Sequence, residues 1–78
     1  MQTYEPHEVK LANEIAETLK DRDSIALFLI YARKYKEKFL RDILARVMSI
    51  DEAKIRKSRG ALFTFLVNQH GPHNNSRS

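Results

Sequence analysis

The chain has very few residues that would interrupt regular secondary structure. Only two glycines and two prolines occur among its 78 residues, and three of these four, Pro6, Gly71 and Pro72, lie near the ends. About 65 central residues therefore contain almost no turn-forming glycine or proline, and their apolar side chains recur at a helical spacing. The sequence predicts an all-α fold, a compact bundle of four to five short helices.

The apolar rhythm divides this stretch into separate helices. We expect helices over residues 6–20, 24–36, 38–48 and 59–69, and a short helix or turn over residues 51–56. Gly71 and Pro72 should stop the last helix. Residues 1–71 are thus predicted to form a single helical domain, and residues 72–78 a flexible polar tail.

Short polar side chains mark the expected helix starts. The segment from Asp21 to Ser24 offers capping oxygens for the second helix, and Ser58 should cap the last one. Ser49 followed by Glu52 has the spacing of a capping box, which would start the short helix. Pro6 suits the first turn of the first helix, because its missing N–H would have no helical partner there.

The second helix should be the centre of the fold. Its residues from Ile25 to Ala32 are apolar almost all round, and such a helix is normally buried on most sides. The third and last helices are expected to pack against it. In the last helix we expect five apolar side chains to point inward: Leu62, Phe63, Phe65, Leu66 and Val67. Because so short a chain has few elements to cover the second helix, a homodimer is plausible.

The composition excludes several classes of protein. There is no cysteine, which rules out disulfides and thiolate zinc sites. The longest uninterrupted apolar segment has eight residues, against about 20 for a membrane span. The N-terminus has no long apolar run behind a basic region, which argues against a secretory signal. We therefore expect a cytoplasmic protein without a membrane partner.

No constellation of residues indicates catalysis or a metal. His70 and His73 are separated by the Gly71-Pro72 break, which favours a polar tail over a ligand pair. Glu17, Asp21 and Asp23 are acidic neighbours, but acids between two helices more often serve as caps than as an acid–base or Mg²⁺ site. We expect no enzyme activity and no cofactor.

The charge distribution is uneven along the chain. Ten of the fourteen Lys and Arg residues lie between Arg33 and Arg59, which also holds four acids. The first 23 residues carry three basic and six acidic side chains, a net charge of −3, so the remainder carries the +7 that gives the chain its +4. A one-sided positive field favours a polyanion or an acidic partner.

The sharpest local feature runs from Lys54 to Ala61. A serine cap followed by arginine and glycine exposes backbone N–H groups at a helix start, with Lys57 and Arg59 beside them. Helix starts bind phosphates for this reason, and Gly60 would allow close approach. The alternative is a solvated turn with an ordinary cap.

A second cluster combines Tyr31 and Tyr35 with the basic residues Arg33, Lys34, Lys36 and Lys38. Basic side chains beside aromatic rings can hold a sugar-phosphate backbone. The alternative is a solvated helix end with two half-buried tyrosines. A helix-turn-helix arrangement is disfavoured, because the last helix offers only Thr64, Asn68 and Gln69 as polar reading groups.

The segment from Ile55 to Phe63, followed by Leu66 and Val67, resembles a segment of small helical proteins from bacterial and mobile-element genomes. Those proteins are uncharacterised or are tails of DNA-associated proteins. The resemblance covers the last half of the chain and implies a helical domain in a nucleic-acid setting. It implies no catalytic residue.

Together these observations predict a small basic protein that binds nucleic acid, DNA or RNA, mainly through phosphate contacts and with weak sequence specificity. The candidate binding residues are Arg33, Lys34, Lys36, Lys54, Arg56, Lys57, Ser58 and Arg59. The alternative is a non-enzymatic protein-interaction module or accessory subunit, with a second copy or an acidic protein as its partner. Exposure of any phenylalanine together with Leu62 or Leu66 would favour that alternative.

Overall fold

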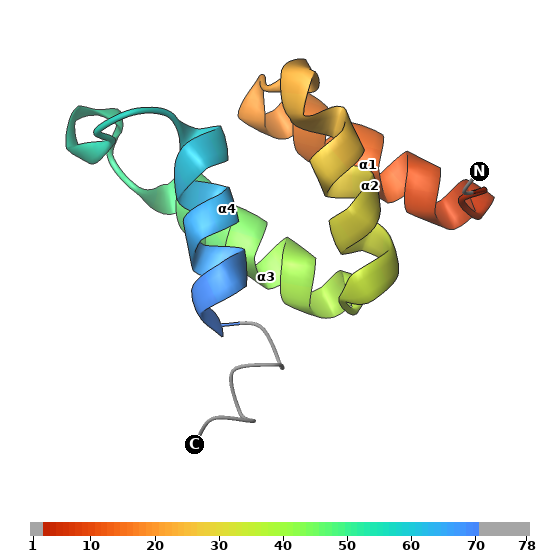
Figure 1. The fold of residues 1–78 in the computed structure, drawn as a ribbon. Coiled ribbons are helices and arrows are strands. Elements are labelled where there is room, and N and C mark those ends of the chain that lie inside the picture. Colours follow the sequence, from red (N-terminus) through yellow and green to blue (C-terminus); the bar gives the residue numbers. More distant parts are fainter. Residues whose placement is uncertain (1–2, 71–78) are drawn as a thin grey trace.

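A computed structural model describes residues 3–70, and this part of the chain is all-α (Figure 1). The elements, in order, are α1 (Pro6–Leu19), the 3₁₀ turn η1 (Arg22–Ser24), α2 (Ile25–Lys34), α3 (Glu37–Ser49), the 3₁₀ turn η2 (Glu52–Lys54) and α4 (Arg59–His70). The predicted bundle of short helices is confirmed. The Gly71-Pro72 stop and the predicted tail at residues 72–78 lie outside the described residues.

The first two long helices form an antiparallel hairpin. Pro6 is the first helical residue of α1, and a capping box precedes it: the Glu5 N–H donates to the Glu8 carboxylate at 2.8 Å. At the other end Lys20 adopts a left-handed conformation with φ of 56°. This residue ends the helix and turns the chain into η1, so that α2 folds back along α1.

The second hairpin consists of α3 and α4, and an abrupt corner joins it to the first. Tyr35 and Lys36 both have extended backbone, which separates α2 from α3 without a loop. The connection between α3 and α4 is longer and contains η2. Figure 1 shows α1 and α2 together on the right, and α3 leading from them to the left, where α4 crosses it.

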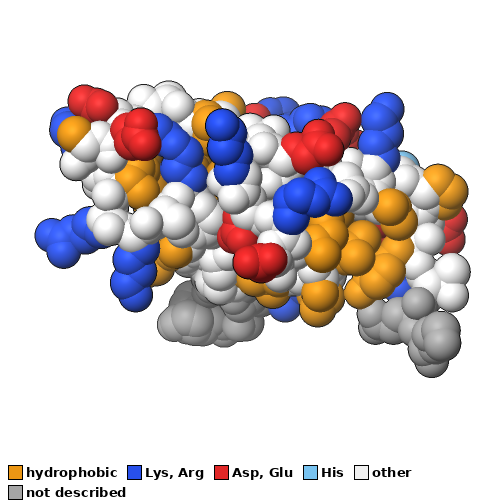
Figure 2. Space-filling model, turned by 90° about the horizontal axis from the view of Figure 1, so that it is seen from above, with side chains coloured by type: hydrophobic (Ala, Val, Ile, Leu, Met, Phe, Trp, Pro, Cys, Tyr) orange, Lys and Arg blue, Asp and Glu red, His pale blue; other side chains and the backbone are white. Residues whose placement is uncertain are grey.

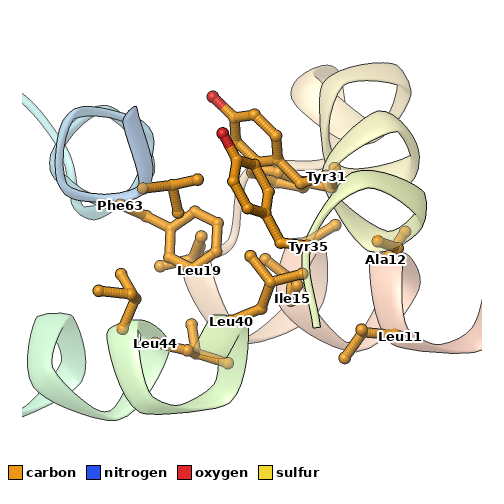
Figure 3. Packing of buried hydrophobic residues seen from close by; sticks show 14 of the residues in the cluster. Leu11, Ala12, Ile15, Leu19, Tyr31, Tyr35, Leu40, Leu44 and Phe63 are labelled. Atoms are coloured by element: carbon orange, nitrogen blue, oxygen red, sulfur yellow. The ribbon is translucent and has the colours of Figure 1, made fainter. Parts of the chain in front are cut away.

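The core lies where the two hairpins meet. Phe63 of α4 is fully buried, and its ring stands edge-on to that of Phe28 with 5.7 Å between centroids. The Tyr31 ring lies 6.4 Å from that of Phe63 and 5.7 Å from that of Tyr35. Figure 3 shows Phe63 pointing from α4 toward Leu19 and the tyrosines. Aromatic side chains therefore bridge the two hairpins.

Two expectations about burial are wrong. α2 is not covered on most sides: it buries Phe28, Tyr31 and Ala32, but Ile30 on its outer face keeps 48% of its surface exposed. In α4, Phe65 does not point inward and is 57% exposed. Successive helical residues are about 100° apart, so Phe63 and Phe65 lie on opposite sides, and only one of them can reach the core.

Two expectations about helix caps also differ from the structure. Of the segment from Asp21 to Ser24, it is Ser24 that stands at the N-cap position of α2, and its side chain makes no capping hydrogen bond. Ser49 does not begin the short helix, because its hydroxyl donates backward to the Arg46 carbonyl at 2.8 Å. Asp51 caps η2 instead, accepting from the Ala53 N–H. Several side chains could cap these turns, and local spacing alone does not choose among them.

The buried tyrosines provide a test of this packing. The hydroxyl of Tyr35 is buried and has no hydrogen-bond partner within residues 3–70, whereas that of Tyr31 donates to the Asn68 side-chain oxygen at 3.4 Å. Tyr35→Phe should therefore leave stability unchanged or raise it, by up to about 1–3 kcal/mol, the cost of an unpaired buried polar group. Tyr31→Phe should lower it by about 0.5–1.5 kcal/mol. Urea unfolding followed by circular dichroism measures both; a larger loss for Tyr35→Phe than for Tyr31→Phe would contradict the packing.

Candidate functional site

The predicted binding residues fall into two groups at separate places. Lys34 and Lys36 lie at the corner between α2 and α3, close to Arg33, whereas the other group runs from Lys54 at the end of η2 to Arg59 at the start of α4. Figure 1 shows that this corner and the η2–α4 connection are at opposite ends of the molecule. The structure therefore does not gather the predicted cations onto one continuous surface.

Arg33 is held by the first helix. Its guanidinium contacts both carboxylate oxygens of Glu8, at 2.9 and 3.4 Å, and donates to the Thr3 carbonyl at 2.6 Å. It also lies 4.5 Å from the centroid of the Tyr4 ring. The Glu8 side chain is only 10% exposed. Arg33 thus neutralises a largely buried acid and fastens α2 to the start of α1, so we assign it a structural role.

Arg59 is also engaged within the fold. Its guanidinium donates to the carbonyls of Val47 and Ile50, at 2.7 and 3.0 Å. These carbonyls are at the C-terminal end of α3, where the helix dipole is negative and helical N–H partners are lacking. Arg59 therefore ties the start of α4 to the end of α3.

The start of α4 is capped from within the chain. The Ser58 hydroxyl accepts from the Ala61 N–H at 3.0 Å, which confirms the predicted cap. A Cβ atom at Gly60 would collide with the carboxylate of Asp21, so that carboxylate lies directly against the glycine. The close approach expected at Gly60 is therefore made by an acid of the same chain. An external phosphate would have to rely on nearby side chains.

Three predicted cations surround a hollow beside α4. The hollow has a volume of about 480 Å³ and is lined by Lys54, Ile55, Arg56, Lys57, Ser58, Ala61, Leu62 and Phe65. We call it the α4 hollow. Its apolar part comes from the η2–α4 connection and from the face of α4 that points away from the core. Within residues 3–70, Lys54, Arg56 and Lys57 are all exposed and form no ion pair.

The charge around the hollow is mixed but asymmetric. Asp51 and Glu52 are exposed on the preceding turn, yet neither lines the hollow. In Figure 2 the η2–α4 end, on the left, shows projecting Lys and Arg side chains around apolar ones, with acidic side chains to one side. A ligand in the hollow would meet positive charge at its rim and apolar surface inside.

The other predicted cluster offers no aromatic platform. Tyr31 and Tyr35 are each only 5% exposed, so neither ring can stack on a base. Burial raises the pKa of Tyr31, which keeps its hydroxyl neutral. The ammonium of Lys34 lies 5.6 Å from the centroid of the Tyr35 ring. Lys34 and Lys36 are exposed, and neither lines the α4 hollow.

The acids of α1 are largely matched by cations of the same chain. Arg41 of α3 contacts Glu14 at 2.6 Å as well as Glu37, and Arg22 lies 3.6 Å from Glu17. With the Glu8–Arg33 pair, three of the first helix's carboxylates are partnered internally. The acidic start of the chain is therefore a poor docking surface for a basic partner.

Other kinds of site find no support in the described residues. Within residues 3–70, no three His, Cys, Asp or Glu side chains are grouped so that they could hold a metal ion. His73, one of the two histidines considered from the sequence, lies outside this range. None of the helices in this part of the chain combines the length and apolar character needed to cross a bilayer.

Comparison of the chain with protein-family models, curated proteins and solved structures finds no match. The functional assignment therefore rests on the geometry of the chain itself. Sequence reasoning identified the cations of the α4 hollow but missed Phe65. The available signal was the two-residue spacing between Phe63 and Phe65, which places the two rings on opposite sides of a helix.

The Glu8–Arg33 pair should make stability depend on pH. The hydrogen bond from Arg33, followed by that from the Glu5 backbone, lowers the pKa of Glu8 from its ordinary value of 4.5. A carboxyl whose pKa is lowered by folding stabilises the protein above its unfolded pKa, and this contribution is lost as the pH falls through the folded value. Glu8→Gln should therefore reduce the loss of stability between about pH 6 and pH 3.

Urea unfolding at a series of pH values measures this effect. Arg33→Gln is the matched variant, because it removes the other partner, and it should flatten the same part of the pH profile. The double variant should show little further change. A wild-type-like profile in both single variants would show that the pair does not contribute.

Proposed function

We propose that the α4 hollow binds single-stranded nucleic acid, DNA or RNA, with weak sequence specificity. The observation that supports this most is the combination of three unpaired cations, Lys54, Arg56 and Lys57, with an exposed aromatic ring in one hollow. Nonspecific single-strand binding sites combine these same two elements: charge that follows the backbone and rings on which bases stack.

The two parts of the hollow have different tasks in this proposal. The cations contact phosphates through charge, which gives affinity without reading sequence. Phe65 supplies the stacking surface, since more than half of the residue's surface is exposed, and Ile55 and Leu62 extend that apolar surface. Arg59 and Arg33 position helices and do not contact the ligand.

A single strand suits this site better than a duplex. A base can lie on Phe65 only when it is free of its own stack. Reading base edges in a major groove would instead require polar side chains along α4. α4 has few polar side chains, and the side-chain oxygen of one of them, Asn68, accepts a hydrogen bond from the Tyr31 hydroxyl.

The second candidate is a protein-interaction module that takes an acidic, amphipathic segment of a partner. The mainly apolar lining of the hollow favours it, since Phe65 is exposed beside Leu62. Basic rims around an apolar groove suit a helix with acidic and apolar faces. Both candidate functions use the residues of the α4 hollow. They differ in the ligand, which is a single-stranded nucleic acid in the first and an acidic, amphipathic peptide segment in the second.

Fluorescence-anisotropy titrations with single-stranded and duplex oligonucleotides at several salt concentrations test the proposal. For a single strand contacting three cations, log affinity should fall with log salt at a slope of about −2, and Lys57→Gln should reduce that slope by about 0.7. Phe65→Ala should weaken binding roughly 5- to 150-fold while leaving the slope unchanged, since stacking releases no counterions.

Lys36→Gln is the matched control, because it removes a lysine that is also exposed but lies at the other end of the molecule. It should bind like the wild type. Equal losses for Lys36→Gln and Lys57→Gln, or no binding to any oligonucleotide at low salt, would overturn the proposal. Phe65-dependent binding of an acidic amphipathic peptide without oligonucleotide binding would establish the second candidate instead.

A further inference from the structure

The outer face of α2 carries apolar surface that nothing in residues 3–70 covers. Ala26 and Ile30 are exposed there, Ile30 by 48%, and Leu27 beside them is half-buried. The opposite face of the helix packs Phe28 and Tyr31 into the core. Figure 2 shows apolar side chains gathered over the half of the molecule that α1 and α2 form, away from the η2–α4 end.

Opposite charges lie at the two ends of this face. Asp23 precedes the helix and Lys34 is its last residue. At about 100° per residue, Leu27 and Lys34 both project within about 60° of Ile30, and Asp23 lies in η1, two residues before the first residue of α2. Asp23 and Lys34 are exposed, and neither forms an ion pair within the described residues. The face is thus an apolar centre with an acid at one end and a base at the other.

We propose that this face binds a second copy of the chain, with the two α2 helices antiparallel across a two-fold axis. In that arrangement Leu27 of each copy meets Ile30 of the other, and Asp23 meets Lys34 twice. A two-fold contact uses the same patch on both copies, so the patch must complement itself. The α2 face meets this requirement when antiparallel, whereas a parallel pairing would place like charges together.

The size of the face sets the strength of the contact. α2 has ten residues, so it is about 15 Å long, and the area it can bury is well below the roughly 1,600 Å² of a standard interface. The dimer is therefore weak and forms with increasing protein concentration. It leaves the α4 hollow open in each copy, and it does not depend on what that hollow binds.

Sedimentation equilibrium of the full chain over micromolar to millimolar concentrations tests this proposal. The wild type should shift from monomer toward dimer. Ile30→Asp, which buries two charges at the centre of the contact, should raise the dissociation constant about tenfold or more. Because Ile30 is half-exposed in the monomer, circular dichroism should show an unchanged helical content.

Exchanging the charges of Asp23 and Lys34 tests the antiparallel pairing more specifically. Asp23→Lys and Lys34→Asp should each weaken the dimer, since either places like charges together, and the double variant Asp23→Lys/Lys34→Asp should restore it. Phe65→Asp is the control for association through the α4 hollow and should dimerise like the wild type. A monomer at all concentrations, association lost in Phe65→Asp but not in Ile30→Asp, or no rescue in the double variant would overturn the proposal.

Discussion

The insertion of Phe63 between the two hairpins is the contact on which the rest of the structure depends. α1 packs on α2 and α3 packs on α4, and Phe63 joins these two pairs through its contacts with Phe28 and Tyr31. A buried phenylalanine contributes about 1.5–3 kcal/mol by burial alone, and edge-on aromatic pairs add about 0.5–1.5 kcal/mol each. Because α4 is anchored on this one side, its opposite side and the α4 hollow face outward.

Internal pairing of charges decides which cations remain for a ligand. The long arginine side chains do most of this pairing: Arg33 and Arg41 reach acids of α1, and Arg59 reaches the carbonyls at the end of α3. The rigid, multidentate guanidinium suits such positions. The cations left around the hollow are Lys54, Arg56 and Lys57. The net charge of +4 is therefore a poor guide to where a polyanion would bind.

The sequence was sufficient for the helices but only partly for the site. Apolar periodicity placed the helix boundaries within about two residues, and Ser58 was recognised as a cap from local spacing. Contacts between distant segments were not predictable in this way: Glu8 and Arg33 are 25 residues apart, and nothing in their neighbourhoods signals the pair. The orientation of α4 was partly readable, since Phe63 and Phe65 cannot both face one side. Which of them faces inward depends on tertiary packing.

The exposed apolar surfaces of α4 and α2 have a common origin in the layering of the fold. Two hairpins give each helix a single buried side, and residues 3–70 form no third layer that would cover the other side. For α4, whose sequence is apolar on both sides, the result is Phe65 in a hollow with a basic rim. For α2 the result is Ile30 between Asp23 and Lys34. The charges around the two surfaces differ. The α4 hollow has a rim of one sign, which selects a ligand of opposite charge. The α2 face has one charge of each sign at its ends, which makes it complementary to itself.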